Sequence, residues 1–210
     1  MADLVLLPVS DWRSVGRAVE ALRAGLVVAF PTDTVYGLGA HSRSATAIEQ
    51  LYAIKGRERQ KAIPLLLSSV DQVVEVARQV PPIAWRLADR FWPGALTLVL
   101  PRVRSVLDVL TGGADSIGVR VPAHDVALQV ISELGVPLAA TSANMSGQPE
   151  ARTAQGVLDT LGARIRLVLD GGVCPGGVAS TVVDLTSEPP TILRRGLLAG
   201  EVEAFLRQAL

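Results

Sequence analysis

Basic side chains occupy alternate positions in the stretch KGRERQK, which contains Lys55, Arg57, Arg59 and Lys61. At the end of a helix, one or two of them would complement the negative C-terminal end while the others faced water. In a loop, the same spacing can point Lys55, Arg57 and Lys61 toward one anionic ligand, because guanidinium groups match phosphate and carboxylate oxygens. The cluster therefore indicates a polyphosphate site, with a solvated helix end as the alternative.

Polar residues also follow four short apolar runs that are expected to be strands. PTDTVYGLG (31–39) comes after LVVAF, and TSANMSG (141–147) comes after PLAA. DGGVCPGGVAST (170–181) follows IRLVL, and the pair Arg194 and Arg195 follows TIL. Turns need the same residue types, so each segment alone has an ordinary explanation. Because ligands of open α/β sheets bind beyond the carboxyl ends of strands, the recurrence favours a shared pocket.

Several standard catalytic and nucleotide-binding patterns are missing. The chain has no GxxxxGK[ST], and Ser42 stands where the third glycine of a GxGxxG beginning at Gly37 would be. A single cysteine, Cys174, excludes an internal disulfide and a multi-cysteine zinc site, and neither of the two histidines lies in a triad context. The chemistry is therefore expected to depend on positioning and charge, without a covalent enzyme intermediate or a metal held by the protein alone.

Apolar periodicity and capping residues predict alternating helices and strands around these segments. The expected helices run from the cap Asp11 to Gly25, from the cap Ser44 to Gly56, from 70 to 78, from 83 to 91, from 124 to 134, from the cap Thr153 to 161, and onward from 201. The expected strands span 26–30, 64–68, 95–100, 117–121, 137–141, 165–169, 181–185 and 191–193. This alternation predicts an α/β sheet covered on both faces, and the closely spaced late strands indicate a mixed sheet.

Composition limits the class of protein. At 210 residues, the chain is expected to form a single domain over 1–210. No apolar run approaches the roughly 20 residues that span a bilayer, and the N-terminus does not match a secretory signal, so we expect a cytoplasmic protein without a membrane partner. Basic and acidic residues balance at a formal net charge of zero, which argues against a whole surface built to attract nucleic acid.

Seven motifs together resemble the YrdC family, also called TsaC, of L-threonylcarbamoyladenylate synthases. The motifs are PTDTVYGLG, KGR followed by IPLLL, FWPGALTLVL, IGVRVP, TSANMSG, GVASTVVDL and ILRRG, in the family's order over about 26–196. The resemblance implies a twisted open mixed sheet flanked by helices, with a large concave basic cavity. It also places the chain with the short type, without the extra C-terminal domain of the longer relatives.

The resemblance implies an enzyme that joins L-threonine, bicarbonate or CO2, and ATP into threonylcarbamoyl-AMP and pyrophosphate. The product would pass to tRNA threonylcarbamoyl transferase proteins, which modify the adenosine beside the anticodon. Mg²⁺ is expected to arrive with ATP, because the sequence shows no carboxylate cluster that would hold it independently. A weak contact with RNA is the remaining partner expected.

Residue roles follow from the resemblance by position. Lys55 and Arg57 are the expected catalytic residues. The residues expected to bind ATP are Arg57, Lys61, Ser116, Ser142, Asn144, Glu150 and Arg194, with Lys55 beside them. The residues expected to surround threonine are Thr34, Ser68, Arg120, Ala140 and Ser180, with Arg120 meeting the carboxylate.

Departures from the family pattern leave some roles open. Ser68 stands where some relatives have a threonine-contacting histidine, and Glu58, Ala179 and Arg195 replace a common Pro, Glu and Pro, respectively. Because two arginines adjoin, either Arg194 or Arg195 could face the nucleotide.

Within PTDTVYGLG, the two glycines are expected to bend the chain away from the preceding strand. Asp33 and Tyr36 could orient this loop rather than touch a substrate.

Two other functions compete with the synthase. A maturation factor that binds RNA without catalysis would use the basic concavity, but only 4% of residues are aromatic, and readers of single-stranded RNA usually offer stacking platforms. A carbamoyl-adenylate activity, like that of the related domain in hydrogenase maturation proteins, would use carbamoyl phosphate in place of threonine. Thr34 and Arg120 favour an amino acid.

Overall fold

A ten-stranded mixed sheet organises residues 4–209, which are the residues that the computed structural model describes. Its strands are β1 (Val5–Pro8), β2 (Val28–Phe30), β3 (Gly37–His41), β4 (Leu65–Leu66), β5 (Leu96–Pro101), β6 (Ser116–Arg120), β7 (Leu138–Ser142), β8 (Leu167–Asp170), β9 (Thr181–Asp184) and β10 (Thr191–Arg194). They lie in the order β1-β8-β2-β3-β7-β4-β6-β5-β9-β10. The sheet contains parallel pairs such as β2 with β8 and antiparallel pairs such as β5 with β6, which confirms the mixed α/β sheet.

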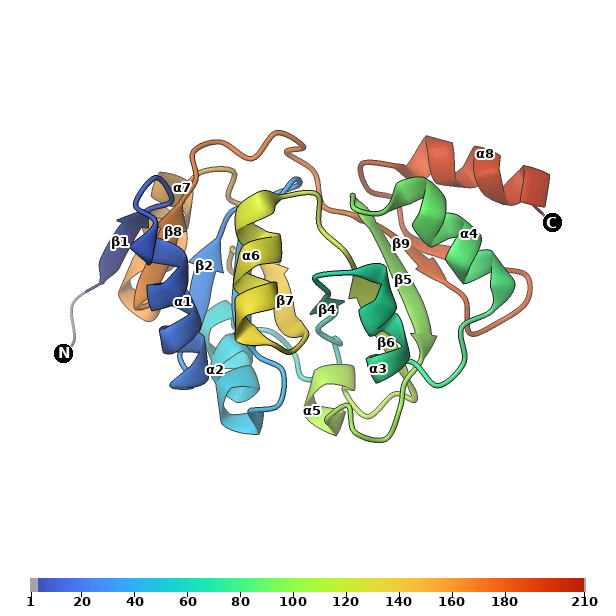
Figure 1. The fold of residues 1–210 in the computed structure, drawn as a ribbon, viewed down its shortest axis with the longest axis horizontal. Coiled ribbons are helices and arrows are strands. Elements are labelled where there is room, and N and C mark those ends of the chain that lie inside the picture. Colours follow the sequence, from blue (N-terminus) through green and yellow to red (C-terminus); the bar gives the residue numbers. More distant parts are fainter. Residues whose placement is uncertain (1–3, 210) are drawn as a thin grey trace.

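Helices cover both faces of the half of the sheet that contains β2, β3 and β7 (Figure 1). The helices are α1 (Arg13–Arg23), α2 (Ala45–Lys55), α3 (Val73–Val76), α4 (Pro82–Phe91), α5 (Asp108–Thr111), α6 (Asp125–Leu134), α7 (Ala154–Leu161) and α8 (Ala199–Ala209). Residues of α1 and α6 form one core cluster with Phe30 and Leu138 on one face. Residues of α2 and α7 form another core cluster with Ala29 of β2 and Leu38 of β3, whose side chains point to the opposite face of the sheet.

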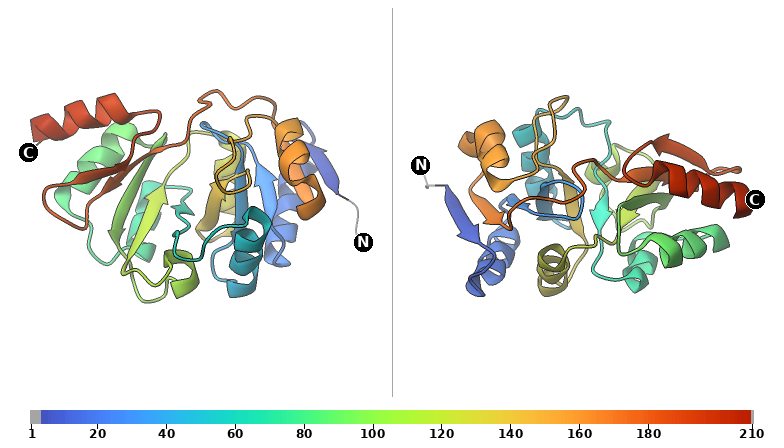
Figure 2. Two further views of the ribbon diagram at one scale, coloured as in Figure 1. Left: turned by 180° about the vertical axis from the view of Figure 1, so that it is seen from behind. Right: turned by 90° about the horizontal axis from the view of Figure 1, so that it is seen from above.

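The other half of the sheet is covered differently. Leu96 and Leu98 of β5 belong to the same core cluster as Leu87 of α4, whereas Thr97, between them, points to the opposite side and lines a pocket. Arg120 of β6 lines the same pocket. In the view from behind, β5 and β6 lie open without a helix in front of them (Figure 2). The pocket lined by Thr97 and Arg120 lies on this side of the sheet.

Two of the three expected N-caps are confirmed. The Ser44 side chain accepts a hydrogen bond from the Ala47 N–H at the start of α2, and Thr153 caps α7 in the same way. Gly56 ends α2 in the left-handed conformation, with φ of +59°. The prediction for Asp11 is wrong: Trp12 occupies the N-cap position of α1, and the Asp11 carboxylate instead accepts from Arg13 at 3.0 Å.

The expected bend at Gly37 and Gly39 is also wrong, because both residues lie in β3 and pair with β2. Their role is close packing. A Cβ at Gly39 would lie 2.9 Å from the ring of Phe30 and 3.0 Å from Leu138, and a Cβ at Gly37 would lie 3.0 Å from that ring. Phe30 is completely buried, so these glycines leave the space that its ring fills.

Four further elements differ from the sequence prediction. The strands β1 and β3 and the short helix α5 were not predicted. The helix expected over 70–78 is a 3-10 turn followed by α3, which ends because Ala77 is extended and bridges to Arg102. Here tertiary pairing overrides local helix preference.

Among residues 4–209, no helix has the length and apolar character that crossing a membrane requires.

Replacing Gly39 by alanine is expected to lower the free energy of unfolding by about 1–3 kcal/mol, because the new methyl group overpacks a buried ring. Urea unfolding measures the change. Gly16→Ala is the control: an added Cβ in α1 meets nothing within 4 Å, so this variant should gain about 0.5–1 kcal/mol. Equal stability of Gly39→Ala and the parent chain would contradict the packing role of this glycine.

Candidate functional site

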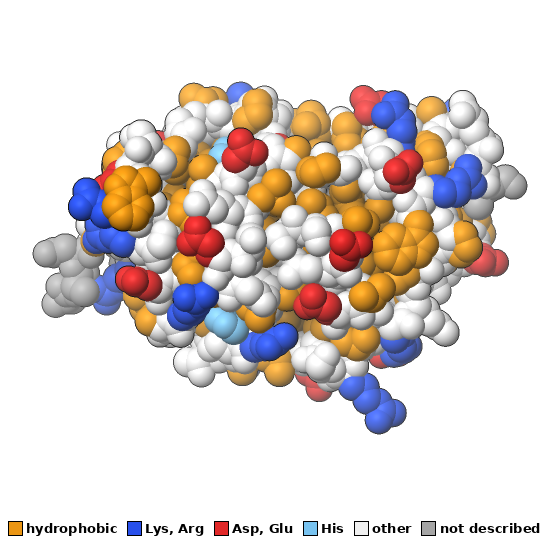
Figure 3. Space-filling model, in the orientation of Figure 1, with side chains coloured by type: hydrophobic (Ala, Val, Ile, Leu, Met, Phe, Trp, Pro, Cys, Tyr) orange, Lys and Arg blue, Asp and Glu red, His pale blue; other side chains and the backbone are white. Residues whose placement is uncertain are grey.

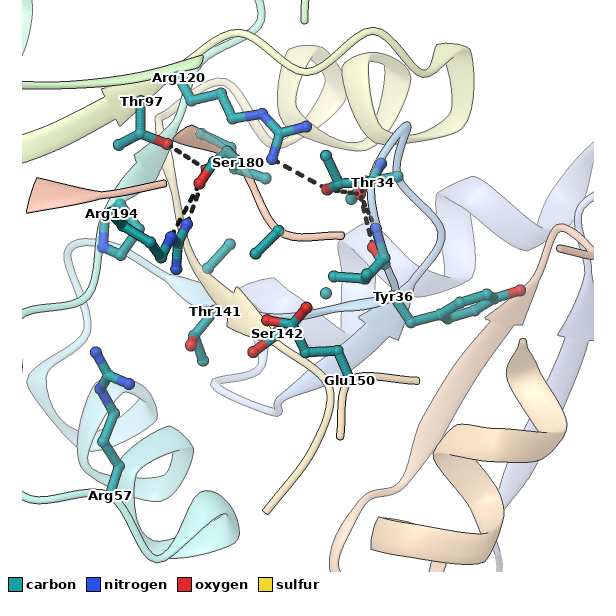
Figure 4. A pocket seen from close by; sticks show the side chains of 17 residues that line it. Thr34, Tyr36, Arg57, Thr97, Arg120, Thr141, Ser142, Glu150, Ser180 and Arg194 are labelled. Carbon is teal, nitrogen blue, oxygen red and sulfur yellow. Dashed lines mark hydrogen bonds between the residues drawn. The ribbon is translucent and has the colours of Figure 1, made fainter. Parts of the chain in front are cut away.

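A pocket with about 650 Å³ of empty space, which includes open solvent at its mouth, lies beside the carboxyl ends of several strands. Figure 4 shows the side chains that surround it. Its lining comprises Thr32, Thr34, Val35, Tyr36, Gly37, Arg57, Pro64, Leu66, Thr97, Arg120, Ala140, Thr141, Ser142, Glu150, Ala179, Ser180 and Arg194. Segments far apart in the chain therefore meet in one cavity, as the recurring polar strand ends indicated.

The pocket brings together most, but not all, of the residues singled out from the sequence. Those that line it are Thr34, Arg57, Arg120, Ala140, Ser142, Glu150, Ser180 and Arg194. Those outside its lining are Lys55, Lys61, Ser68, Ser116 and Asn144.

Arg120 is the most deeply buried cation of the pocket. Its guanidinium donates to the Gly94 carbonyl at 2.8 Å, to Thr34 Oγ1 at 3.2 Å and to Asp33 Oδ1 at 2.5 Å. The side chains of Arg120 and Asp33 are only 8% and 11% exposed. Burial lowers the pKa of Arg120, and the Asp33 carboxylate opposes that shift. Three of the five N–H groups are used by the protein, so two remain for a ligand.

The hydrogen bonds of the two threonine hydroxyl groups beside Arg120 have a defined direction. Thr32 donates its only proton to the Val35 carbonyl at 2.6 Å, because a carbonyl oxygen can only accept. In the 2.9 Å contact between the two threonines, Thr34 must therefore be the donor. Since Thr34 Oγ1 also accepts from Arg120, what it offers to the pocket is a lone pair. It can accept a hydrogen bond from an amine or hydroxyl of a ligand.

A second polar group contains Arg194, Ser180 and Thr97. Arg194 donates from Nε to the Ser180 carbonyl and from Nη2 to Ser180 Oγ, both at 2.9 Å. Ser180 Oγ also shares a 2.8 Å hydrogen bond with the buried Thr97 hydroxyl (Figure 4). Arg195 instead pairs with Glu203 of α8 and does not line the pocket. Of the two adjacent arginines, Arg194 faces the cavity.

Lys55 lies behind the pocket wall rather than in it. Its ammonium group donates to the Ser142 carbonyl, the Asn144 carbonyl and Asn144 Oδ1, at 2.5–2.9 Å, and only 2% of the residue is exposed. Burial lowers the pKa of Lys55 to about 8. All three ammonium protons are committed, so the geometry gives Lys55 the role of holding the segment that carries Ser142 and Asn144.

Arg57 and Lys61 of the basic cluster diverge. Arg57 is half-buried, lines the pocket and donates to the carbonyls of Lys61 and Ala62. The ammonium of Lys61 is exposed, with Glu58 Oε1 at 3.2 Å. The expectation that alternate basic residues converge therefore applies to Arg57 alone in this conformation, because Lys55 turns inward and Lys61 outward.

Two further candidates lie away from the cavity. Ser116 and Arg120 share one side of β6, but they stand at its opposite ends, roughly 13 Å apart along the strand. Ser68 lines a different hollow, with Trp85 and Trp92, and its hydroxyl contacts Gln72 at 3.0 Å. The structure does not bring Ser68 to the pocket that contains Arg120, because the chain leaves the pocket wall after Leu66.

Several lining residues were missed by sequence reasoning. Thr97 carried a signal: it is the one polar residue in the strand ALTLVL, and it points away from its buried neighbours. Thr32 and Thr141 were hidden within motifs whose other residues were chosen. Asp33 and Tyr36, left open by the sequence, both hold the loop. Asp33 binds Arg120, while the Tyr36 hydroxyl donates to the Gly172 carbonyl and accepts from the Gly171 N–H.

Within the described range, no three His, Cys, Asp or Glu side chains gather as a metal site would require. Glu150 is the one carboxylate among the residues that line the pocket. Any divalent cation in this pocket would therefore need ligands from a bound molecule as well.

The sequence of the chain is similar to those of known proteins. Residues 20–196 match the Sua5/YciO/YrdC family model, which is described as "Telomere recombination". The chain is 43% identical over 188 residues to the threonylcarbamoyl-AMP synthase of Pyrococcus abyssi, covering 90% of this chain and 55% of that protein. It is 39% identical over 194 residues to the threonylcarbamoyl-AMP synthase of Bacillus subtilis, covering 91% and 56%, respectively. The chain thus spans little more than half the length of these curated relatives.

The fold agrees with the sequence match. The crystal structure of P. abyssi Sua5 complexed with L-threonine superposes with a TM-score of 0.89 and 41% identity, over 91% of this chain and 57% of that one. From the extent of the family match and the identity to these relatives, the chain belongs to the Sua5/YciO/YrdC family.

Proposed function

We propose that this protein is an L-threonylcarbamoyladenylate synthase, which forms threonylcarbamoyl-AMP and pyrophosphate from L-threonine, bicarbonate or CO2, and ATP. The observation that carries the proposal is the pairing of two recognition groups in one pocket, a buried Arg120 beside Thr34 and a second wall with Arg57 and Arg194. Two relatives named threonylcarbamoyl-AMP synthase and a related structure complexed with L-threonine support it.

The corner formed by Arg120 and Thr34 suits an amino acid. Two free N–H groups of the Arg120 fork can bind a carboxylate, and the lone pair of Thr34 Oγ1 can accept from the amine. Ser180 and Ala140 complete this corner, offering a hydroxyl and a small apolar surface. We assign the threonine substrate to it. Ser68 is left out of this assignment, because it lines another hollow.

The opposite part of the pocket suits a nucleotide. Arg57 and Arg194 supply positive charge for phosphate oxygens. Ser142 Oγ donates to Asn144 Oδ1 at 2.7 Å, so it presents lone pairs that fit a ribose hydroxyl or an adenine amino group better than a phosphate. Lys55 and Asn144 act by fixing Ser142, while Lys61 and Ser116 would require a larger ligand or a rearranged loop to make contact.

The reaction requires two bond-forming steps. The threonine amine, as a free base, attacks the carbon of CO2 and loses a proton to give a carbamate. A carbamate oxygen then attacks the α-phosphorus of ATP, and the bond to the β-phosphate oxygen breaks as pyrophosphate leaves. Both steps gather negative charge, which Arg57 and Arg194 can stabilise while Arg120 fixes the amino acid for in-line attack.

Mg²⁺ fits this site as a companion of ATP, since oxygen ligands could come from the phosphates and from Glu150. When bound, the ion would neutralise phosphate charge. We further propose that the protein works in the cytoplasm and passes its product to tRNA threonylcarbamoyl transferase proteins. A role that rests on RNA binding alone receives less support, because the chain has a formal net charge of zero. Acidic and basic side chains are interspersed on the one face shown in Figure 3.

Pyrophosphate release tests the proposed reaction. We expect purified protein with ATP, Mg²⁺, bicarbonate and threonine to release pyrophosphate, and omission of threonine to abolish the release. Carbamoyl phosphate in place of threonine and bicarbonate should give no turnover. Release that is independent of threonine would contradict the proposal, as would salt-sensitive tight RNA binding without turnover.

Arg120→Lys tests the amino-acid corner. Lysine keeps the charge but loses the fork, so the threonine concentration for half-maximal rate should rise about 10- to 100-fold. The ATP concentration for half-maximal rate should change little. Arg195→Lys, an exposed arginine paired with Glu203, serves as the control and should leave both values unchanged. A larger effect on ATP than on threonine would refute this assignment.

Lys55→Met tests the positioning role of the buried lysine. Loss of three hydrogen bonds to buried acceptors should lower the free energy of unfolding by about 2–4 kcal/mol and reduce turnover as well. Lys61→Met is the matched control on an exposed side chain, and its effect on stability should stay within about 0.5 kcal/mol. Normal stability of Lys55→Met in chemical denaturation would show that the network around Ser142 does not depend on Lys55.

A further inference from the structure

Glu150 is a negative group in a pocket whose other charged lining residues are arginines. Arg57, Arg120 and Arg194 line the same cavity, and Glu150 is the single carboxylate in the lining. Figure 4 shows the Glu150 side chain extending from its loop toward the middle of the pocket. A cavity meant only to attract an anionic ligand would gain nothing from a carboxylate in this position.

Glu150 is also not an ordinary ion-pair partner. Between residues 4 and 209, its carboxylate takes part in no ion pair within 4.0 Å and in no hydrogen bond, whereas Asp33 in the same region binds Arg120 at 2.5 Å. Two basic groups of the site are committed elsewhere, because Arg194 donates to Ser180 and Lys55 donates to Ser142 and Asn144. Burial lowers the pKa of Arg194 and of Lys55, and the Glu150 carboxylate opposes both shifts, so it lies within electrostatic reach of both.

A nucleotide triphosphate placed against Arg57 and Arg194 would bring further negative charge close to this carboxylate. Like charges repel strongly in a partly enclosed pocket, where screening by water is weaker. A divalent cation between the two removes the conflict, because Mg²⁺ is typically bound by one or two carboxylates together with substrate phosphates. No group of three metal-binding side chains exists in the described part of the chain, so the cation would need the phosphates.

We propose that Glu150 is a ligand, through its carboxylate oxygens, for the divalent cation that accompanies the triphosphate, and that it makes the pocket select metal-bound over metal-free nucleotide. This inference rests on the proposed use of ATP. It adds a specificity-determining residue and assigns the metal a ligand from the protein. It also implies that the cation does not bind without nucleotide.

Equilibrium ATP binding, measured by calorimetry in excess Mg²⁺ and again in excess chelator, tests the selection. The wild-type protein should bind ATP at least about tenfold more tightly with Mg²⁺. Glu150→Gln keeps the shape but removes the charge, so it should bind metal-free ATP more tightly than the wild type and lose most of the preference for Mg²⁺. Glu58→Gln, an exposed carboxylate outside the lining, is the matched control and should keep the wild-type preference.

Manganese supplies a second readout that does not depend on turnover. Electron paramagnetic resonance should detect protein-bound Mn²⁺ in the presence of ATP but not in its absence, and Glu150→Gln should weaken the bound signal. Glu150→Ala should behave in the same way, and thermal unfolding of both variants checks that they are folded. An unchanged preference for Mg²⁺ in both variants would overturn the proposal, as would equal loss of ATP binding with and without metal.

Failure of this inference is distinguishable from failure of the proposed function. Metal-dependent ATP binding that needs Glu150, without threonine-dependent pyrophosphate release, would refute the synthase and leave the metal role standing. Threonine-dependent release with an unchanged metal preference in both Glu150 variants would refute the metal role of Glu150 and leave the synthase proposal standing.

Discussion

Arg120 and Asp33 form an ion pair that is almost entirely buried, and the arrangement of the pocket depends on it. Burying two charges costs several kcal/mol per ion unless they are paired and hydrogen bonded. Arg120 meets that condition by donating to Asp33, to Thr34 and to the Gly94 carbonyl. Three segments that are remote in the chain, namely β6, the loop after β2 and the turn before β5, are thereby fixed at one point. Two N–H groups of the same fork remain for a ligand.

The glycine-rich segment 171–177 reinforces this junction. It connects β8 in one half of the sheet to β9 in the other, and it crosses directly over the loop after β2. The Gly176 and Gly177 N–H groups donate to the Asp33 and Thr34 carbonyls. A Cβ at Gly176 would lie 2.6 Å from the Asp33 carbonyl oxygen, so only glycine permits this approach. The loop thus holds in place the backbone that presents Asp33 to Arg120.

Charge within the pocket is divided between groups that are fixed and groups that are free. Lys55, Arg120 and Arg194 donate hydrogen bonds to acceptors of the protein itself. These bonds preorganise the pocket walls, and they leave fewer donors for a ligand. Glu150 has no such bonds within the described residues, and it therefore remains available. The charged residues predicted for this site therefore divide into cations that fix its walls and a carboxylate, Glu150, that is left for a ligand.

The sequence by itself determined most of the local elements and eight of the seventeen residues that line the pocket. Periodicity, the caps Ser44 and Thr153 and the motif resemblance depend on neighbours within a few residues, so they can be read without the fold. Tertiary structure alone decided that Lys55 turns inward, that Arg194 rather than Arg195 faces the cavity, and that Gly37 and Gly39 accommodate the ring of Phe30. It also separated Ser68 from the pocket and paired Asp33 with Arg120. These outcomes depend on contacts between residues distant in the chain, and local spacing carries no information about such contacts.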